Sequence, residues 1–254
     1  MQAIRTEEWT VQAHEKRIYG RIWYPAAAGK HPAVILSHGY NGNHAGFERE
    51  CRFFAQNGVT AYSFDFCGGS VASKSSGVST NMTLFTEKED LLAVVDAAVQ
   101  WDFVDAGAIF LLGGSQGGLV TALAAEERKE QVRGMILYYP AFNIPDDWRH
   151  RFDGAGEIPA EYPFWGLTLG RNFFASMRDF VSFDHIGGFE RPVLIVQGDR
   201  DEIVPPTVAQ RAIKKYKQGK LLILSGEGHG FSAQGAAQAM EAALQRVILP
   251  CVHS

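Results

Sequence analysis

Short runs of apolar residues recur along the chain, each closed by glycine, proline or aspartate. Six of them read "AVILSHG", "VTAYSFDF", "AIFLLGG", "GMILYYP", "PVLIVQGD" and "KLLILSG". A short, continuous apolar run between turn signals is typical of a strand that is buried on both faces of a sheet. The pattern therefore predicts six buried strands.

Segments with a helical repeat of apolar positions separate most of these runs. In "TEKEDLLAVVDAAVQW", Thr86 and Glu89 have the spacing of a capping box and an apolar stripe follows. Similar segments are "GFERECRFFAQNG", "GGLVTALAAEERKE", "PPTVAQRAIKKY" and "AAQAMEAALQRVI". Strands that alternate with helices predict an α/β fold, with a mostly parallel central sheet and helices on both faces. Ahead of them, "TVQAHEKRIYGRIWYP" alternates in hydrophobicity and predicts an antiparallel hairpin that ends at Pro25.

One stretch, residues 141–184, breaks this alternation. Its 44 residues include ten aromatic ones, nearly twice the chain's average share of 12%. A structureless loop of this length is unusual inside a compact domain. We therefore predict a single domain over residues 1–254, with an inserted cap or lid at about 141–184.

Composition narrows the classes of partner. With 46% hydrophobic residues, 20% charged residues and a formal net charge of −4, the chain is globular in type and has no basic excess for nucleic acid. Its three cysteines lie far apart, which argues against a disulfide framework and against a zinc site. The first residues lack the apolar core of a signal peptide, and no apolar run reaches the ~18 residues of a membrane span. We expect a cytoplasmic protein with no membrane partner and no metal.

A serine surrounded by glycines is the first candidate for chemistry. Residues 113–117 read G-G-S-Q-G, with Ser115 at the centre, directly after the apolar run "AIFLLG" and before a predicted helix. A G-x-S-x-G motif on a sharp strand-to-helix turn exposes the serine oxygen above the sheet. The alternative is a glycine-rich turn that binds phosphate, but no G-K-[ST] follows. We therefore predict that Ser115 is a nucleophile.

A serine hydroxyl needs a base and an acid that orients it. His229 lies in "GEGHGF", just beyond the last predicted strand, where parallel strands deliver active-site residues. The loop "GDRDEIVPP" offers Asp199, Asp201 and Glu202. We choose Asp201 and expect Asp199 to bond within its own turn. The chain order serine, aspartate, histidine is the order of the α/β-hydrolases.

Two backbone amides are candidates for an oxyanion hole. One belongs to Gln116, the residue after the nucleophile, and the other to Tyr40 in "HGYNG", which follows the first run of the sheet. We expect His38 and Gly39 to shape this loop. The alternative is that "HGYNG" is an ordinary turn.

The motifs "HGYNG", "GGSQGG", "GDRDEIVP" and "GEGHGF", in this order, resemble the α/β-hydrolase superfamily and its serine esterases. "FDFCGGS", "NMT" and "FWGLTLGRNFF" resemble the bacterial feruloyl or cinnamoyl esterases, whose insertion caps the acyl pocket. The resemblance implies a serine carboxylester hydrolase that forms an acyl-enzyme, needs no cofactor and acts on a small-molecule ester with an aromatic or apolar acyl group.

The insertion supplies the substrate-binding candidates. Where some of the resembled esterases have a tyrosine, this chain has Phe173, which leaves Asp146 or Asp147 as the polar candidate. Trp165 and the other aromatic residues either line an acyl pocket or dock the cap on the core. We expect Cys67 to be a small buried residue rather than a nucleophile. An aminopeptidase, thioesterase or lysophospholipase would use the same three residues, and a ligand-binding protein could keep the fold without turnover.

Overall fold

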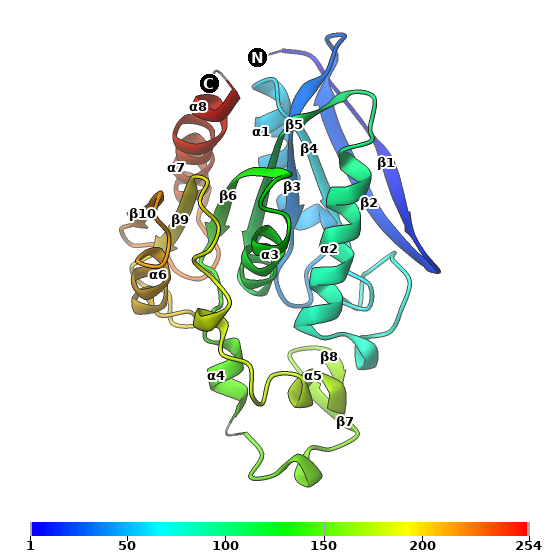
Figure 1. Ribbon diagram of the computed structural model, residues 1–254, viewed down its shortest axis with the longest axis vertical. Coiled ribbons are helices and arrows are strands. Elements are labelled where there is room, and N and C mark those ends of the chain that lie inside the picture. Colours follow the sequence, from blue (N-terminus) through cyan, green and yellow to red (C-terminus); the bar gives the residue numbers. More distant parts are fainter. Residues whose placement is uncertain (1, 150, 253–254) are drawn as a thin grey trace.

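The computed structural model describes residues 2–149 and 151–252, built around an eight-stranded sheet (Figure 1). In spatial order the strands are β1 (Ile4–Ala13), β2 (Lys16–Pro25), β4 (Thr60–Phe64), β3 (His31–Ser37), β5 (Val104–Gly114), β6 (Val132–Tyr138), β9 (Val193–Gly198) and β10 (Gly219–Leu224). From β4 to β10 all neighbours run parallel, whereas β1 and β2 form an antiparallel hairpin that joins β4 antiparallel. The predicted α/β fold, its mostly parallel sheet and its N-terminal hairpin are confirmed.

Strands in the centre of the sheet are more buried than the edge strand β10. The central strands are buried on both faces over most of their length, as their unbroken apolar runs predict. The same prediction was wrong for β10, where Ile223 is 39% exposed. This strand lies at the edge of the sheet and has only β9 beside it.

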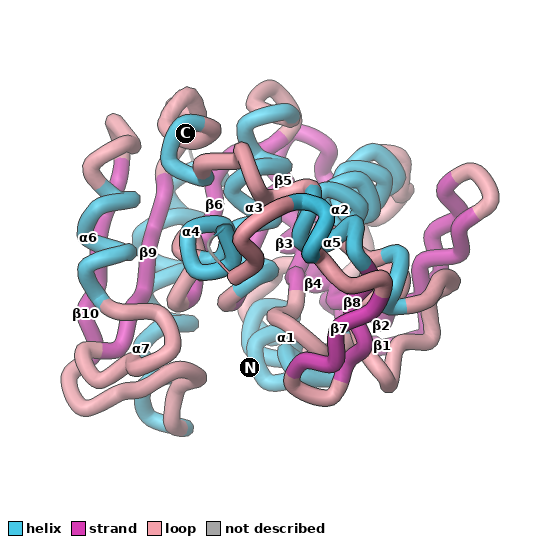
Figure 2. The backbone as a smooth tube through the Cα atoms, turned by 90° about the horizontal axis from the view of Figure 1, so that it is seen from below, coloured by secondary structure: helices cyan, strands magenta, loops and turns pink. Residues whose placement is uncertain are grey.

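Helices cover both faces of the sheet, which Figure 2 shows from below. On one face lie α2 (Leu84–Ala98), α3 (Gln116–Glu127) and α6 (Pro206–Ile213), and on the other α1 (Glu48–Gln56) and α7 (Ala233–Ala243). Each layer packs on its own cluster of buried apolar side chains. Shorter helical segments are η1 (His44–Phe47), η2 (Ser79–Asn81), η5 (Leu244–Ile248) and α8 (Leu249–Val252).

The capping box predicted for α2 was assigned to the wrong residues. The helix begins at Leu84, and Thr83 is its N-cap. The Thr83 hydroxyl accepts the Thr86 backbone N–H at 3.0 Å, while the Thr86 hydroxyl accepts the Thr83 N–H at 2.9 Å. Thr86 therefore occupies the third helical position, where a capping box usually has glutamate or glutamine. The helix also starts earlier than the pair Thr86 and Glu89 predicts.

The segment between β6 and β9 lies below the sheet in Figure 1, at the end opposite the two chain termini. It contains α4 (Ile144–Arg149), η3 (Ala155–Glu157), β7 (Glu161–Phe164), β8 (Leu167–Gly170), α5 (Arg171–Ala175) and η4 (Ser182–Asp184). β7 and β8 pair as a separate antiparallel hairpin. The Trp148 ring packs edge-on against Phe164 and Phe174, at centroid distances of 4.8 and 5.1 Å. Many of the segment's aromatic residues thus form a small cluster of their own.

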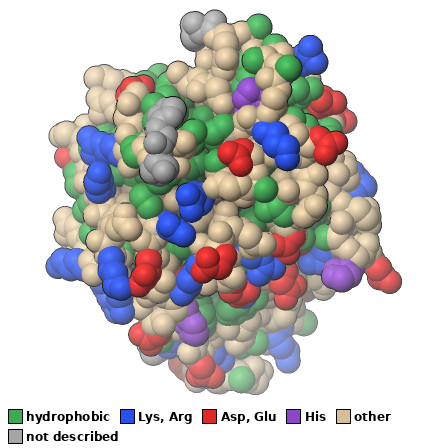
Figure 3. All heavy atoms as spheres, turned by 45° about the horizontal axis from the view of Figure 1, so that its top comes forward, with side chains coloured by type: hydrophobic (Ala, Val, Ile, Leu, Met, Phe, Trp, Pro, Cys, Tyr) green, Lys and Arg blue, Asp and Glu red, His purple; other side chains and the backbone are tan. Residues whose placement is uncertain are grey.

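The surface is mixed in charge. On the face shown in Figure 3, basic and acidic side chains are interspersed, in keeping with the modest net charge of −4. Across the described ranges, no helix combines the length and the apolar character that crossing a bilayer requires.

The central strand β5 allows a direct test of the core. Leu111 is fully buried there, so Leu111→Ala should lower the free energy of unfolding by about 2–5 kcal/mol, because it removes apolar contacts and leaves a cavity. Urea denaturation measures this. Ile223→Ala on the exposed edge strand is the control and should cost less than about 1 kcal/mol. Equal losses at the two positions would contradict the assigned core.

Candidate active site

Three residues that are far apart in the sequence meet at one edge of the sheet. Ser115 follows β5, Asp201 follows β9 and His229 follows β10, and the carboxyl ends of parallel strands share an edge. The Ser115 Oγ lies 2.9 Å from the Nε2 of His229. The Nδ1 of the same ring lies 2.9 and 3.2 Å from the two oxygens of Asp201. This geometry fits an imidazole that donates from Nδ1 to the carboxylate and accepts the serine O–H at Nε2.

Ser115 occupies a strained backbone conformation. Its φ of 55° and ψ of −123° lie where side chains are rarely tolerated, and α3 begins at the next residue. The flanking glycines make the turn possible. A Cβ atom on Gly117 would lie 2.2–2.3 Å from the carbonyl oxygens of Ser37 and His38, and one on Gly113 would lie 2.3 Å from the carbonyl oxygen of Gly117. A side chain at either position would therefore collide with the backbone.

The Asp201 carboxylate is buried and held by several donors. Its Oδ1 accepts the backbone N–H groups of Ile203 and Val204, at 3.0 and 2.9 Å. Its Oδ2 accepts from the Nε2 of Gln197 at 2.9 Å. These bonds fix the face that the carboxylate presents to His229. Gln197 is not among the predicted site residues, although a single amide inside the apolar run "PVLIVQGD" marks it in the sequence.

The hydrogen-bond partner of Asp199 differs from the predicted one. Its Oδ1 accepts the backbone N–H of Gly226 at 2.6 Å, so it does not bond within its own turn. Gly226 lies in the loop after β10, three residues before His229. Asp199 therefore ties together the two loops that carry Asp201 and His229.

Tyr40 and Gln116, the residues predicted to supply backbone amides, both lie near the serine. Both residues border the same cavity as Ser115, and neither amide donates a hydrogen bond to any residue that the structure describes. Gly39 packs so closely on the serine that a Cβ atom there would lie 3.0 Å from the Ser115 Cβ. Both backbone N–H groups are therefore available as donors next to the cavity that Ser115 borders.

His38 fixes the loop that carries Tyr40. The ring is buried; its Nδ1 donates to the carbonyl oxygen of Gly39 at 2.7 Å, and its Nε2 accepts the backbone N–H of Phe66 at 3.1 Å. These two bonds set a single neutral tautomer. Burial also lowers the pKa of His38. His38 is therefore a structural residue of this loop, as the sequence predicts.

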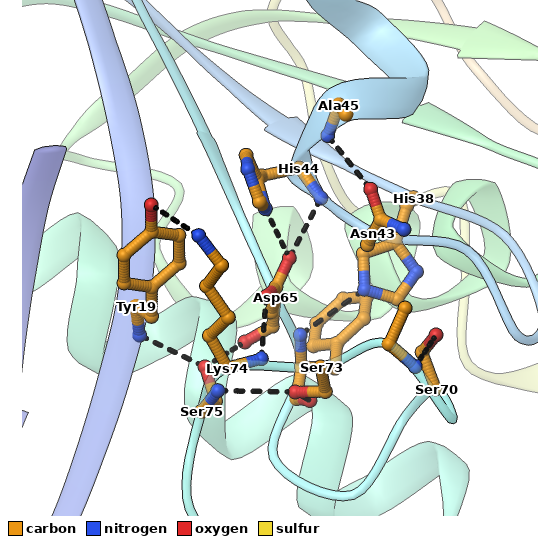
Figure 4. Close-up of polar contacts among 12 residues, drawn as sticks. Tyr19, His38, Asn43, His44, Ala45, Asp65, Ser70, Ser73, Lys74 and Ser75 are labelled. Carbon is orange, nitrogen blue, oxygen red and sulfur yellow. Dashed lines mark hydrogen bonds and ion pairs between the residues drawn. The ribbon is translucent and has the colours of Figure 1, made fainter. Parts of the chain in front are cut away.

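Asp65 bonds to His44, the first residue of η1, which follows this loop, as Figure 4 shows. One of its oxygens accepts from the backbone N–H and the Nδ1 of His44, at 2.7 and 2.8 Å, and the other accepts the Lys74 backbone N–H at 2.8 Å. On the opposite side, the Tyr40 hydroxyl donates to the carbonyl oxygen of Phe164, in the β7–β8 hairpin, at 2.7 Å. The Tyr40 loop is thus fastened to the core and to the inserted segment.

A buried acid holds the Gln116 side chain. The Gln116 Nε2 donates to the Glu87 Oε2 at 2.8 Å, and Glu87 is only 1% exposed. Burial raises the pKa of Glu87 to about 8, so the carboxyl is mostly protonated at neutral pH. This pair is not predictable from the sequence, because Glu87 is one of several acidic residues near the start of α2 and only the packing shows which of them is buried.

A cavity of about 390 Å³ opens beside Ser115. We call it the larger cavity, because a second, smaller one also borders Ser115. Among the predicted substrate-binding residues, Asp147, Trp165 and Phe173 border it together with Tyr40 and Gln116. Asp146 does not border it and instead forms an ion pair with Arg149 at 2.7 Å. The Asp147 carboxylate accepts from the Nδ2 of Asn143 at 2.6 Å, and partial burial raises its pKa.

Cys67 does not offer a competing nucleophile. The side chain is 8% exposed, and burial raises the pKa of its thiol to about 12. A thiol with such a pKa carries almost no thiolate at neutral pH. Cys67 is a small buried residue, as predicted.

Known proteins share this architecture. The sequence model of a family described as "Serine aminopeptidase, S33" matches residues 29–177, and one described as "TAP-like protein" matches residues 182–249. The solved structure described as "Ferulic Acid bound to Est1E from Butyrivibrio proteoclasticus" is 27% identical, with a TM-score of 0.86 over 97% of this chain and 100% of that one.

Curated relatives match over a shorter length. The monoglyceride lipases of Rattus norvegicus and Homo sapiens are each 30% identical over 131 residues, which make up 51% of this chain. The match spans about two fifths of the length of these lipases, 41% of each.

The choice between the two aspartates can be tested through the reactivity of the serine. Asp201→Asn should slow the labelling of Ser115 by a fluorophosphonate probe roughly 10³-fold or more, because the imidazole loses its orienting carboxylate. Asp199→Asn is the matched control and should slow labelling less than tenfold. A larger loss at position 199 would overturn the assignment of Asp201.

Glu87 predicts a pH dependence of stability. Its pKa is about 8 in the folded chain against an ordinary value of 4.5, so its stabilising contribution is full below pH 4.5 and is lost as the pH rises through about 8. Glu87→Gln keeps an acceptor for Gln116 and removes the titration. Between pH 6 and pH 9 the parent should lose on the order of 1–3 kcal/mol more stability than this variant.

Chemical denaturation at the two pH values measures that difference. The neighbouring Asp90, whose pKa is also raised by burial, is present in both proteins. Identical pH dependence in the parent and in Glu87→Gln would show that Glu87 does not titrate in this range.

Proposed function

The chain belongs to the serine aminopeptidase S33 family of α/β-hydrolases, and we propose that it is a serine hydrolase that cleaves carboxylic esters through an acyl-enzyme. The proposal is carried by the continuous hydrogen-bonded series Ser115–His229–Asp201, whose serine borders the larger cavity. The ferulic-acid complex of Est1E and the monoglyceride lipases, which are esterase- and lipase-like relatives, support an ester as the substrate.

Each side chain of the series has one part in the proposed mechanism. The Ser115 Oγ attacks the ester carbonyl carbon while the Nε2 of His229 takes its proton. The imidazolium is stabilised by Asp201, which also fixes its tautomer, and it then gives the proton to the departing alcohol oxygen. Water attacks the acyl-enzyme with the same groups acting in reverse.

The amides of Gln116 and Tyr40 stabilise the oxyanion in this proposal. They are free to donate, and they lie on a helix start and on a loop fastened by His38 and Asp65. Donors that are already oriented contribute about 3–4 kcal/mol each to transition-state stabilisation. The Glu87–Gln116 pair supports one of them from inside the core.

The larger cavity takes the acyl group in this proposal. Its apolar walls include Ile144, Trp148, Phe164 and Phe173, all from the segment at 141–184, which we propose is a cap inserted in a single hydrolase domain. An aromatic or apolar acyl group suits such walls. Asp147 is the proposed polar anchor, because its carboxyl borders the cavity and is partly desolvated.

An aminopeptidase is a second candidate, favoured by a specific feature of the cavity. Asp147 and Glu202 both border it, and a carboxylate is the natural partner of the free α-ammonium group of a peptide. A panel of alkyl, aryl and thio esters, together with aminoacyl amides, separates these activities. Preference for esters supports the esterase, whereas cleavage confined to the aminoacyl amides would replace it.

Removing the nucleophile tests the proposal itself. Ser115→Ala should lower kcat for p-nitrophenyl acetate on the order of 10⁵–10⁶-fold, while circular dichroism shows an unchanged fold. Ser225→Ala, at an exposed serine outside the hydrogen-bonded series, should leave kcat within twofold of the parent. Undiminished hydrolysis by Ser115→Ala would refute the mechanism.

A further inference from the structure

Two cavities, not one, meet at Ser115. Beside the larger cavity lies a second one of about 260 Å³, which we call the smaller cavity. Both are bordered by Tyr40, Ser115 and Trp165. An ester has two parts, one on each side of the carbonyl carbon, so two cavities at one nucleophile can hold both parts at once.

The two cavities differ in which residues of the proposed catalytic machinery border them. His229 borders the smaller cavity and Gln116 borders the larger one, and neither borders both. In the tetrahedral intermediate the leaving oxygen must face the imidazole that protonates it, and the oxyanion must face the backbone amides. The remaining substituent of the tetrahedral carbon is the acyl chain, which must therefore point away from His229. We propose that the smaller cavity is the subsite for the alcohol part of the ester.

This assignment rests on the proposed esterase function and states which alcohols the enzyme accepts. Besides Tyr40 and Trp165, which it shares with the larger cavity, the smaller cavity is bordered by the aromatic residues Phe47 and Tyr139 and by three glycines, and none of the residues that border it is Asp, Glu, Lys or Arg. Its volume is below the ~300 Å³ at which pockets begin to enclose drug-sized ligands. The subsite therefore takes a neutral alcohol with about one ring-sized group and excludes carboxylated or phosphorylated alcohols.

Tyr139 has features of a residue placed for function. Its φ of 37° is rare for a residue with a side chain, and such strain persists only where the surroundings impose it. Its ring centroid lies 4.6 Å from that of His229. The ring also packs beside Gly114, another residue that borders the smaller cavity. A Cβ atom added to Gly114 would lie 3.5 Å from the edge of the Tyr139 ring and 3.6 Å from its hydroxyl oxygen.

The Tyr139 hydroxyl is available to a ligand. It forms no hydrogen bond with the residues that the structure describes, and burial raises the pKa of Tyr139 to about 12, so it stays protonated at neutral pH. A phenol in this state can donate to a second hydroxyl on the bound alcohol. Tyr139 is thus a specificity-determining residue of the alcohol subsite, with its ring as part of the wall and its hydroxyl as a donor.

A crossed comparison of two variants and two pairs of esters tests the assignment. Phe47→Leu alters the smaller cavity and Phe173→Leu makes the same change in the larger one. Benzyl acetate against methyl acetate varies the alcohol, and methyl cinnamate against methyl acetate varies the acyl group. A ratio of kcat/KM values within one preparation does not depend on how much of a variant is folded.

We expect Phe47→Leu to lower the benzyl-to-methyl ratio roughly 2–10-fold, the range for loss of an aromatic contact, and to leave the cinnamate-to-acetate ratio unchanged. Phe173→Leu should do the reverse. If Phe47→Leu shifts the acyl ratio instead, or shifts neither ratio, the assignment of the smaller cavity is overturned. If the parent enzyme hydrolyses none of the three esters, the proposed function fails and the subsite fails with it.

A separate pair of variants tests whether the Tyr139 hydroxyl donates a hydrogen bond to the alcohol. Tyr139→Phe should lower kcat/KM for glycerol monoacetate relative to propyl acetate roughly 2–10-fold, since it removes one hydrogen bond, and should leave the benzyl-to-methyl ratio unchanged. Tyr138→Phe is the matched control, because the neighbouring Tyr138 is buried and does not border the smaller cavity. An equal effect of the two substitutions would overturn the role given to the Tyr139 hydroxyl.

Discussion

The strained turn at Ser115 is the constraint on which the rest of the site depends. A residue with φ of 55° and ψ of −123° at the end of a central strand lifts its hydroxyl out of the sheet. The chain must then enter α3 at once, and the start of that helix passes against the carbonyl groups of Ser37 and His38. Only glycine at position 117 permits this approach, because any Cβ atom would lie 2.2–2.3 Å from those oxygens.

The site contains two buried acids, Asp201 and Glu87, whose hydrogen-bond partners differ. Asp201 accepts hydrogen bonds from two backbone amides, from Gln197 and from His229, which together stabilise a buried carboxylate. Glu87 has one side-chain donor, Gln116, and its raised pKa leaves it mostly protonated at neutral pH. One acid thus presents a carboxylate to the imidazole, and the other supports a neighbouring amide without adding a second buried charge.

The sequence allowed prediction of much of this arrangement because the features involved are local. Apolar runs closed by glycine or aspartate indicate central strands, and the loops after them hold Ser115, Asp201 and His229, whose convergence follows from the parallel topology. Contacts between distant segments could not be predicted. Asp199 bonds to Gly226 and Glu87 to Gln116, and neither partner is visible from the spacing along the chain.

Two further errors have local causes. The capping box of α2 uses Thr83 and Thr86, a pair outside the usual acidic or amide pattern. The strand β10 has a sequence like that of its neighbours, yet it is half-exposed because it lies at the edge of the sheet. In the segment at 141–184, side-chain clusters between short elements provide the order, and such clusters have no sequence period.

In the proposed mechanism Ser115 carries the acyl group during turnover. Mass spectrometry of the intact protein and of its peptides, after acid quench within milliseconds of mixing with p-nitrophenyl butyrate, detects such an acyl group. We expect a butyryl mass increment on the peptide that contains Ser115, formed with a burst of p-nitrophenol and decaying as the ester is consumed. Steady release of p-nitrophenol from an enzyme that never gains this increment, or gains it on another residue, would show that Ser115 is not the nucleophile.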